Sequence, residues 1–258
     1  MTGETGCLTC GLATIRSSTR NKEPHSGATR PGEYLFLDTQ HPIVQASLTI
    51  STSYPFYLLI VDAYSRYVKL YGIPKKSTDA IVSALKQYQA DHSPHGAYGY
   101  MDVDRIRTDA GSQFTSTSFA EFCIRNGIRL SLAAPKKQYQ NHLVERTWQT
   151  VTSTTRALLI HARLPDTFWF HALVYSTYIF NALPVRGLRG NNIDVPSNPH
   201  ELFFGSKPRI AHLRTFGCPV VIRKWTSSDK TNGKQTERGI RGIFIGLNAH
   251  QKGYHSRV

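Results

Sequence analysis

The sequence predicts an α/β fold in which a mixed β-sheet is flanked by helices and followed by a small β-rich appendage. Apolar runs of strand length alternate with stretches of helical periodicity, in the order β-β-β-α-β-α-β-α-α, which provides five strands and helices for the faces of one sheet. The 258 residues, 40% of them hydrophobic, suffice for one large domain with a core. Short apolar segments separated by glycines return in residues 207–258 and predict the appendage.

The first three strands are predicted from apolar runs. One is Tyr34–Asp38, and the next is Phe56–Asp62, an almost continuous apolar run typical of a strand buried on both faces. The third, Arg66–Gly72, follows a turn at Ala63–Ser65. The second and third strands are therefore expected to form a hairpin.

Helices and strands then alternate. Ser77 is a predicted N-cap, and the helix after it has apolar residues at helical spacing. These residues are Ile81, Ala84, Leu85 and Tyr88. Two further strands are expected at 103–109 and 128–133, with a short helix at Ser116–Asn126 between them that ends at Gly127.

Two long helices follow, at about Leu143–Ala162 and Phe168–Leu183. The second lies in the longest apolar stretch, Phe168–Val185, which four polar residues interrupt. We expect a core helix there, because a membrane span needs about 20 more uniformly apolar residues. Val220–Arg223 and Gly242–Gly246 are the predicted strands of the appendage.

The chain is strongly basic, with 31 Lys and Arg against 17 Asp and Glu and a net charge of +14. Residues 207–258 alone carry eleven basic and two acidic side chains. Such an imbalance favours a polyanionic partner, most commonly nucleic acid, over the alternative of a soluble tail that binds nothing specific. Four cysteines are too few for a disulfide scaffold of this size, and the N-terminus shows no signal peptide, which indicates an intracellular protein.

Three carboxylates stand where catalytic groups collect. Asp38 and Asp109 follow predicted strands, and Glu145 lies near the start of a long helix. Mg²⁺ prefers such oxygen ligands, and a pair of divalent ions can serve phosphodiester chemistry. Asp62 also ends a strand and is a rival to Asp38.

The spacing of these carboxylates resembles a known signature, since 35 residues lie between Asp109 and Glu145. Retroviral and retrotransposon integrases have two aspartates and a glutamate with this spacing between the last two. Asp109–Phe114 (DAGSQF) is similar to their Asp-Asn-Gly-Gly-Glu-Phe, and Gln140–Arg146 (QNHLVER) to their Gln-Asn-Gly-x-x-Glu-Arg. Further segments resemble the copia-type members of the family: Val61–Tyr67, Asn198–Pro208, Leu213–Pro219 and Arg241–Tyr254.

The resemblance implies an RNase H-like fold and a polynucleotidyl transferase that processes retroelement DNA ends and joins them to target DNA with Mg²⁺ or Mn²⁺. It implies Asp38, Asp109 and Glu145 as metal ligands, and it favours Asp38 over Asp62, whose Asp-x-x-Ser-Arg context matches the second strand of the family. A homo-oligomer acting in the nucleus, without a membrane, is also implied. The residues expected to contact DNA are Lys136, Lys137, Tyr139, Gln140 and Arg146.

The expected organisation is a linker with a partial zinc module at 1–33, the catalytic core at 34–185 and a basic appendage at 186–258. Cys7 and Cys10 resemble the cysteine half of the family's His/His/Cys/Cys module. Zinc needs four ligands, so we expect no stable zinc site unless the missing half is supplied. The chain is expected to be a piece of a polyprotein.

Four residues depart from the integrase pattern, namely Ala110, Ser112, Gln113 and His142. The last replaces a loop glycine and restricts the backbone there. Alternatives to an active integrase are therefore a catalytically inactive nucleic-acid-binding remnant, an RNase H-like nuclease without joining activity, and a scaffold that binds no nucleic acid.

Overall fold

A computed structural model of the chain describes residues 27–41, 55–92, 102–133, 142–185, 188, 197–223, 239–247 and 253–257. Its main feature is a five-stranded sheet with the order β3-β2-β1-β4-β5. The strands are β1 (Tyr34–Gln40), β2 (Phe56–Asp62), β3 (Val68–Ile73), β4 (Arg105–Thr108) and β5 (Arg129–Leu132). β2 runs antiparallel to both neighbours, whereas β4 and β5 run parallel to β1. This is the RNase H-like arrangement, and the predicted mixed sheet is confirmed.

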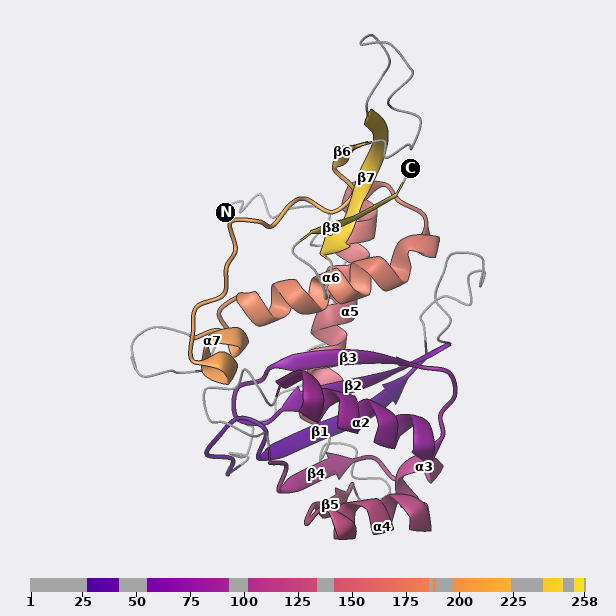
Figure 1. The fold of residues 1–258 in the computed structure, drawn as a ribbon, viewed down its shortest axis with the longest axis vertical. Helices are drawn as coiled ribbons and strands as arrows, with labels where there is room; N and C mark the ends of the chain where they lie inside the picture. Colours follow the sequence, from indigo (N-terminus) through magenta and orange to yellow (C-terminus); the bar gives the residue numbers. More distant parts are fainter. Residues whose placement is uncertain are drawn as a thin grey trace, which may run out of the picture.

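Helices cover both faces of the sheet. Figure 1 shows α2 in front of the sheet and α5 behind it, with α6 above. The helices are α2 (Thr78–His92), α3 (Ser112–Thr115), α4 (Thr117–Arg125), α5 (His142–Ala162), α6 (Trp169–Ala182) and α7 (Pro199–Phe204), with a 3₁₀ turn at Asp166–Phe168. None of the helices in the described part of the chain is long and apolar enough to cross a membrane.

The two faces of β1 enter different cores, because side chains alternate along a strand. Leu35 and Leu37 pack with the apolar face of α2 and with α4. Tyr34 and Phe36 pack instead with Leu143 at the start of α5. All four side chains are at least 93% buried, which matches the near-continuous apolar character of the strand.

The short helix α4 begins and ends at the predicted signals. The Ser116 hydroxyl accepts a hydrogen bond from the Phe119 amide at 3.2 Å and caps the first turn. Gly127 follows with φ of +67°, the left-handed conformation that glycine adopts without steric cost. The helix therefore stops in time for the chain to enter β5.

A second sheet of three antiparallel strands confirms the predicted β-rich appendage. It consists of β6 (Pro219–Arg223), β7 (Gly239–Leu247) and β8 (Tyr254–Arg257). Phe244 of β7 is fully buried and meets the ring of Tyr175 on α6 edge-on, with 5.3 Å between centroids. Phe216 stacks on the same tyrosine at 6.1 Å. The small sheet is therefore packed onto α6, which Figure 1 shows between the two sheets.

Several details differ from the sequence prediction, which did not include the strand β8 and ended β1 at Asp38 rather than at Gln40. β3 begins at Val68 rather than at residue 66, because the turn extends through Arg66, whose φ is +64°. The helices α3 and α7 were not predicted. The division into segments at 33/34 and 185/186 stays a prediction.

Candidate active site

Asp38 lies in β1, and Asp109 directly follows β4, the parallel neighbour of β1. The β1–β4 register pairs Tyr34 with Arg105 and Phe36 with Arg107. Continued by two residues, that register sets Asp38 level with Asp109. Adjacent strands are about 4.8 Å apart, and residues two apart share a face, so both carboxylates follow the face of Tyr34 and Phe36, which α5 covers.

Glu145 joins these two aspartates from α5. Burial raises the pKa of Asp38 to about 6, and the negative charges of Asp109 and Glu145 raise it further, against a hydrogen bond from Gln40 that lowers it. Asp38 is 9% exposed, whereas Asp109 is open to solvent. The structure thus brings the three predicted carboxylates within electrostatic reach of one another.

The three carboxylates do not close on a single point. Among the residues that the structure describes, no three His, Cys, Asp or Glu side chains gather closely enough to hold one metal ion. Asp38 is held within β1 and Asp109 directly follows β4, whereas Glu145 stands in the first turn of α5.

Polar neighbours hold the two aspartates in place. The amide of Gln40 donates a hydrogen bond to Asp38, and the backbone N–H of Gly111 donates one to Asp109 at 3.1 Å. Gln113 donates from Nε2 to the Thr39 hydroxyl at 3.1 Å, which connects the segment after Asp109 to β1. Gln113 is one of the departures from the integrase pattern, and its amide makes a contact that a carboxylate could not donate.

Asp62, the rival ligand, lies elsewhere. On β2, Asp62 pairs with Leu35, whereas Asp38 pairs with Leu59. Asp62 is three residues from Leu59 along β2, which places it about 10 Å from the level of Asp38. Its side chain has no exposed surface and accepts hydrogen bonds from the Ser65 amide at 2.7 Å, the Ser65 hydroxyl at 2.6 Å and the Gly32 amide at 2.8 Å. Burial raises the pKa of Asp62 to about 6. These donors make it a structural carboxylate that fixes the β2–β3 turn.

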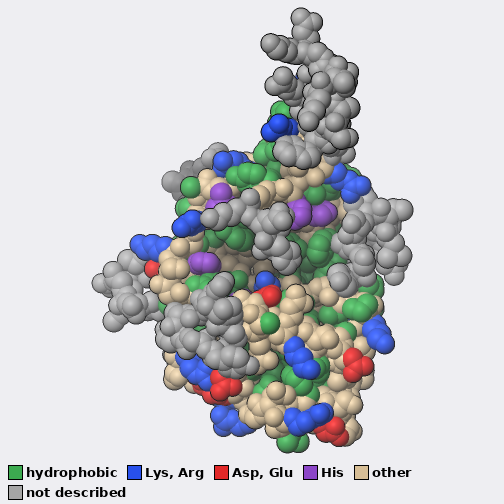
Figure 2. All heavy atoms as spheres, in the orientation of Figure 1, with side chains coloured by type: hydrophobic (Ala, Val, Ile, Leu, Met, Phe, Trp, Pro, Cys, Tyr) green, Lys and Arg blue, Asp and Glu red, His purple; other side chains and the backbone are tan. Residues whose placement is uncertain are grey.

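The predicted DNA contacts are described only in part. Lys136, Lys137, Tyr139 and Gln140 lie outside the described residues, as do Cys7 and Cys10. Arg146 follows Glu145 on α5 and is half-buried. On the face shown in Figure 2, Lys and Arg side chains are spread over the surface rather than gathered into one patch.

Comparison with known families and proteins agrees with the motifs. Residues 28–138 match the integrase core domain family. The chain is 26% identical over 253 residues to the retrovirus-related Pol polyprotein from transposon RE1 of Arabidopsis thaliana, an alignment that covers 96% of this chain and 16% of the relative. It is 26% identical over 199 residues to the corresponding polyprotein from transposon TNT 1-94 of Nicotiana tabacum, covering 77% and 14%.

A solved structure with a similar fold is the HTLV-2 integrase catalytic core domain in complex with magnesium. It is 22% identical, with a TM-score of 0.46, and the match covers 67% of this chain and 97% of that one. The chain spans about a sixth of the length of the Arabidopsis RE1 polyprotein. The resemblance predicted from the motifs is confirmed at the level of the integrase core and the Pol polyproteins.

Proposed function

We infer, from the match of residues 28–138 to the integrase core domain family, that this chain cuts the ends of retroelement DNA and joins them to target DNA. The observation that supports this most directly is that Asp109, which follows β4, and Glu145 of α5 both lie within electrostatic reach of Asp38 on the neighbouring strand β1. Phosphodiester transfer needs no protein nucleophile, because water or a DNA 3′-hydroxyl attacks. The protein has to position the phosphate and the attacking oxygen.

The residues present fit a divalent cation. Burial raises the pKa of Asp38, the charges of Asp109 and Glu145 add to this, and a cation would relieve their repulsion. Carboxylate oxygens are the ligands that Mg²⁺ and Mn²⁺ prefer. Asp38 and Asp109 would hold the cation, and Glu145 would complete the set. A bound divalent ion supplies Lewis acidity toward the phosphate and lowers the pKa of the attacking hydroxyl.

The remaining residues of the site have binding and orienting roles in this proposal. Gln113 and Gly111 fix the segment after β4, so that Asp109 keeps its position beside β1. Lys136, Lys137, Tyr139, Gln140 and Arg146 would bind the DNA backbone and its end. Self-association on paired DNA ends and action in the nucleus belong to the same proposal.

The test is Mn²⁺-dependent cleavage and joining of labelled linear DNA by the wild-type chain beside Glu145→Gln. We expect products from the wild type and none from the variant. Glu121→Gln is the matched control, since Glu121 is exposed on α4 and its one ion pair among the described residues is with Arg125 of the same helix, at 3.6 Å. Its products should equal those of the wild type.

Two other results would replace the proposal. Salt-dependent DNA binding without cleavage, in wild type and variant alike, would identify an inactive nucleic-acid-binding remnant. Cleavage without joining would identify a nuclease. The replacements at Ala110, Ser112, Gln113 and His142 are the sequence features that favour the first of these.

A further inference from the structure

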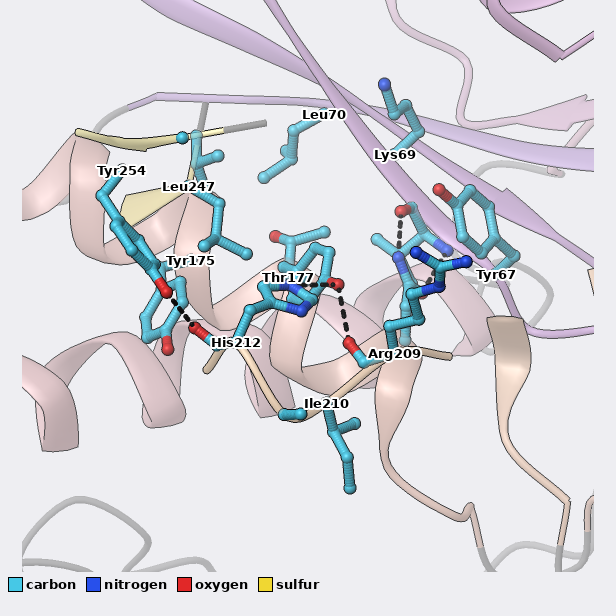
Figure 3. A pocket seen from close by; sticks show the side chains of 16 residues that line it. Tyr67, Lys69, Leu70, Tyr175, Thr177, Arg209, Ile210, His212, Leu247 and Tyr254 are labelled. Atoms are coloured by element: carbon cyan, nitrogen blue, oxygen red, sulfur yellow. Dashed lines mark hydrogen bonds between the residues drawn. The ribbon is translucent and has the colours of Figure 1, made fainter. Parts of the chain in front are cut away.

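A cavity of about 1170 Å³ lies between β3, α6 and the segments around residues 209–212 and 253–254, and none of the three candidate carboxylates lines it. Figure 3 shows side chains from these elements around one space, with Leu70 from β3, Tyr175 from α6, Ile210 and His212 from the segment after α7, and Tyr254 from β8. Its volume exceeds the roughly 300–1,000 Å³ of small-molecule sites. The cavity is thus large enough for a polymer segment.

One wall of this cavity is the free edge of the sheet. β3 is the outer strand and pairs only with β2. At Val68 the side chain of Asn181 takes the place of a missing neighbour strand: its Oδ1 accepts from the Val68 N–H at 2.9 Å, and its Nδ2 donates to the Val68 carbonyl at 2.8 Å. The backbone groups of Val68 therefore point away from β2.

The backbone N–H and carbonyl of Leu70 also point away from β2. In an antiparallel ladder the outward-pointing backbone pairs recur at every second residue, and the β2–β3 register runs unbroken from Val68 to Ile73. Leu70 lines the cavity. Within the described part of the chain no hydrogen bond reaches its outward N–H or carbonyl. One donor and one acceptor of strand geometry thus face the cavity.

The lining is apolar with a positive charge at one side. Three exposed large hydrophobic side chains of the molecule meet here: Val174 at 41%, Ile210 at 59% and Tyr254 at 47% exposed. No Asp or Glu is among the lining residues. Lys69 is 3.6 Å from Asp91, whereas Arg209 is exposed and makes no ion pair within the described residues. The site therefore suits apolar side chains and a carboxylate.

We propose that this cavity binds an extended, acidic peptide segment of a partner protein, which adds as a strand to the edge of β3. The peptide backbone pairs with Leu70 as the Asn181 amide pairs with Val68, alternate apolar side chains contact Val174 and Ile210, and a carboxylate meets Arg209. Strand addition of this kind combines main-chain hydrogen bonds with side-chain pockets.

A peptide suits the edge better than a nucleic acid does. The outward carbonyl of Leu70 needs a hydrogen-bond donor, and phosphate oxygens only accept. A peptide unit offers both a donor and an acceptor, as the Asn181 amide does. The sugar-phosphate backbone of a DNA strand bound here would offer the carbonyl of Leu70 no donor.

The test uses a fluorescein-labelled hexapeptide of alternating valine and aspartate, with binding to the full chain followed by anisotropy. Two further versions carry N-methyl groups on one or the other alternate set of amides. In an extended peptide only one of the two alternate sets of amides faces β3. A methyl group on those amides removes the hydrogen bond to β3 and blocks close approach, so we expect that peptide to bind about tenfold more weakly. The peptide methylated on the other set should bind like the parent. The amide resonance of Leu70 should shift on titration.

Charge is tested with Arg209→Glu, which should weaken binding about tenfold. Arg129→Glu, the same change at an exposed position on β5 at the opposite edge of the sheet, should have no effect. A hexapeptide of alternating valine and lysine should not bind. Binding that ignores methylation and Arg209→Glu, or no binding of the parent peptide, overturns the proposal. Displacement of the peptide by oligo(dT) without a shift at Leu70 assigns the cavity to nucleic acid and overturns it as well.

Discussion

Asp38 and Asp109 each stand two residues beyond Phe36 and Arg107, the last pair of the β1–β4 ladder. Since β1 and β4 are parallel neighbours, both chains leave the sheet at the same edge. The pairing therefore explains how residues 71 positions apart in the sequence come close enough for the charge of Asp109 to raise the pKa of Asp38, whose shift comes mainly from burial.

This arrangement predicts that Asp38→Asn stabilises the fold in EDTA at neutral pH. The folded-state pKa of Asp38 is raised from 3.8 to about 6, so the wild type loses stability as the pH rises from about 4 to 6 and has lost it fully at pH 7. The variant should gain up to about 3 kcal/mol at pH 7, since one pKa unit corresponds to about 1.4 kcal/mol. At pH 4 the gain should be small.

Urea unfolding at the two pH values measures this difference. Asp166→Asn, at an exposed position in the 3₁₀ turn, is the control and should leave stability unchanged. An equal gain at both pH values would contradict the explanation by ionisation. Joining activity should be lost in Asp38→Asn despite its higher stability.

Asp62→Ala should have the opposite effects to Asp38→Asn, with lower stability and retained joining activity. Removing this carboxylate leaves the amides of Gly32 and Ser65 without their acceptor in a fully buried place, and each orphaned donor costs about 1–3 kcal/mol. Denaturation should therefore show a large loss of stability. The folded protein below its melting temperature should still join DNA, and a complete loss of joining there would return Asp62 to the list of candidate ligands.

His92 predicts acid sensitivity. It is 3% exposed, and burial lowers its pKa from 6.5 to about 4. A lowered folded-state pKa gives stability that is present above 6.5 and is lost as the pH falls toward 4, by up to about 3 kcal/mol. The rings of Tyr67, Tyr88 and Phe203 surround it, while Lys69 lowers and Asp91 raises its pKa.

The comparison of wild type with His92→Gln isolates this contribution from those of Asp38 and Asp62, which change in the same pH range with the opposite sign. Between pH 7 and pH 4.5 the free energy of unfolding of the wild type should fall relative to that of His92→Gln. A difference that is constant with pH would show that His92 does not titrate in this range.

Asn181→Ala should open the edge of β3. The variant loses both hydrogen bonds to Val68, and we expect a loss of about 2–3 kcal/mol together with faster hydrogen exchange at the Val68 amide. Asn126→Ala is the matched control: Asn126 is exposed and donates one hydrogen bond, to the Phe122 carbonyl at 2.7 Å. Exchange at Val68 should be unchanged in the control.

Much of the fold could be predicted because its signals are local. The apolar run of β2 and the helical spacing of α2 each depend on a few neighbouring residues, and both elements form as expected. The helix α7 has signals too, with Asn198 as N-cap, Pro199 in the first turn and Gly205 at φ of +70°. It was missed because six residues are too few for helical periodicity to show.

The candidate site could be predicted only where the sequence spacing and local context of its residues carry a signal. Spacing and context favoured Asp38 over Asp62, and pairing register and hydrogen bonds now give the physical reason, because they place Asp62 on the opposite face of the sheet with three donors. The contact of Gln113 with Thr39 joins elements 74 residues apart and has no signal in either segment. The same holds for the pairing of Asn181 with Val68.

The packing of Phe216 and Phe244 against α6 has a consequence for how the molecule unfolds. Trp169, Leu173 and Tyr175 on this helix form one buried cluster with Val151 of α5 and Phe244 of β7, so detaching either neighbour would expose part of this cluster to water. Melting should therefore be cooperative across both sheets, and a calorimetric scan should give one peak whose van't Hoff and calorimetric enthalpies agree.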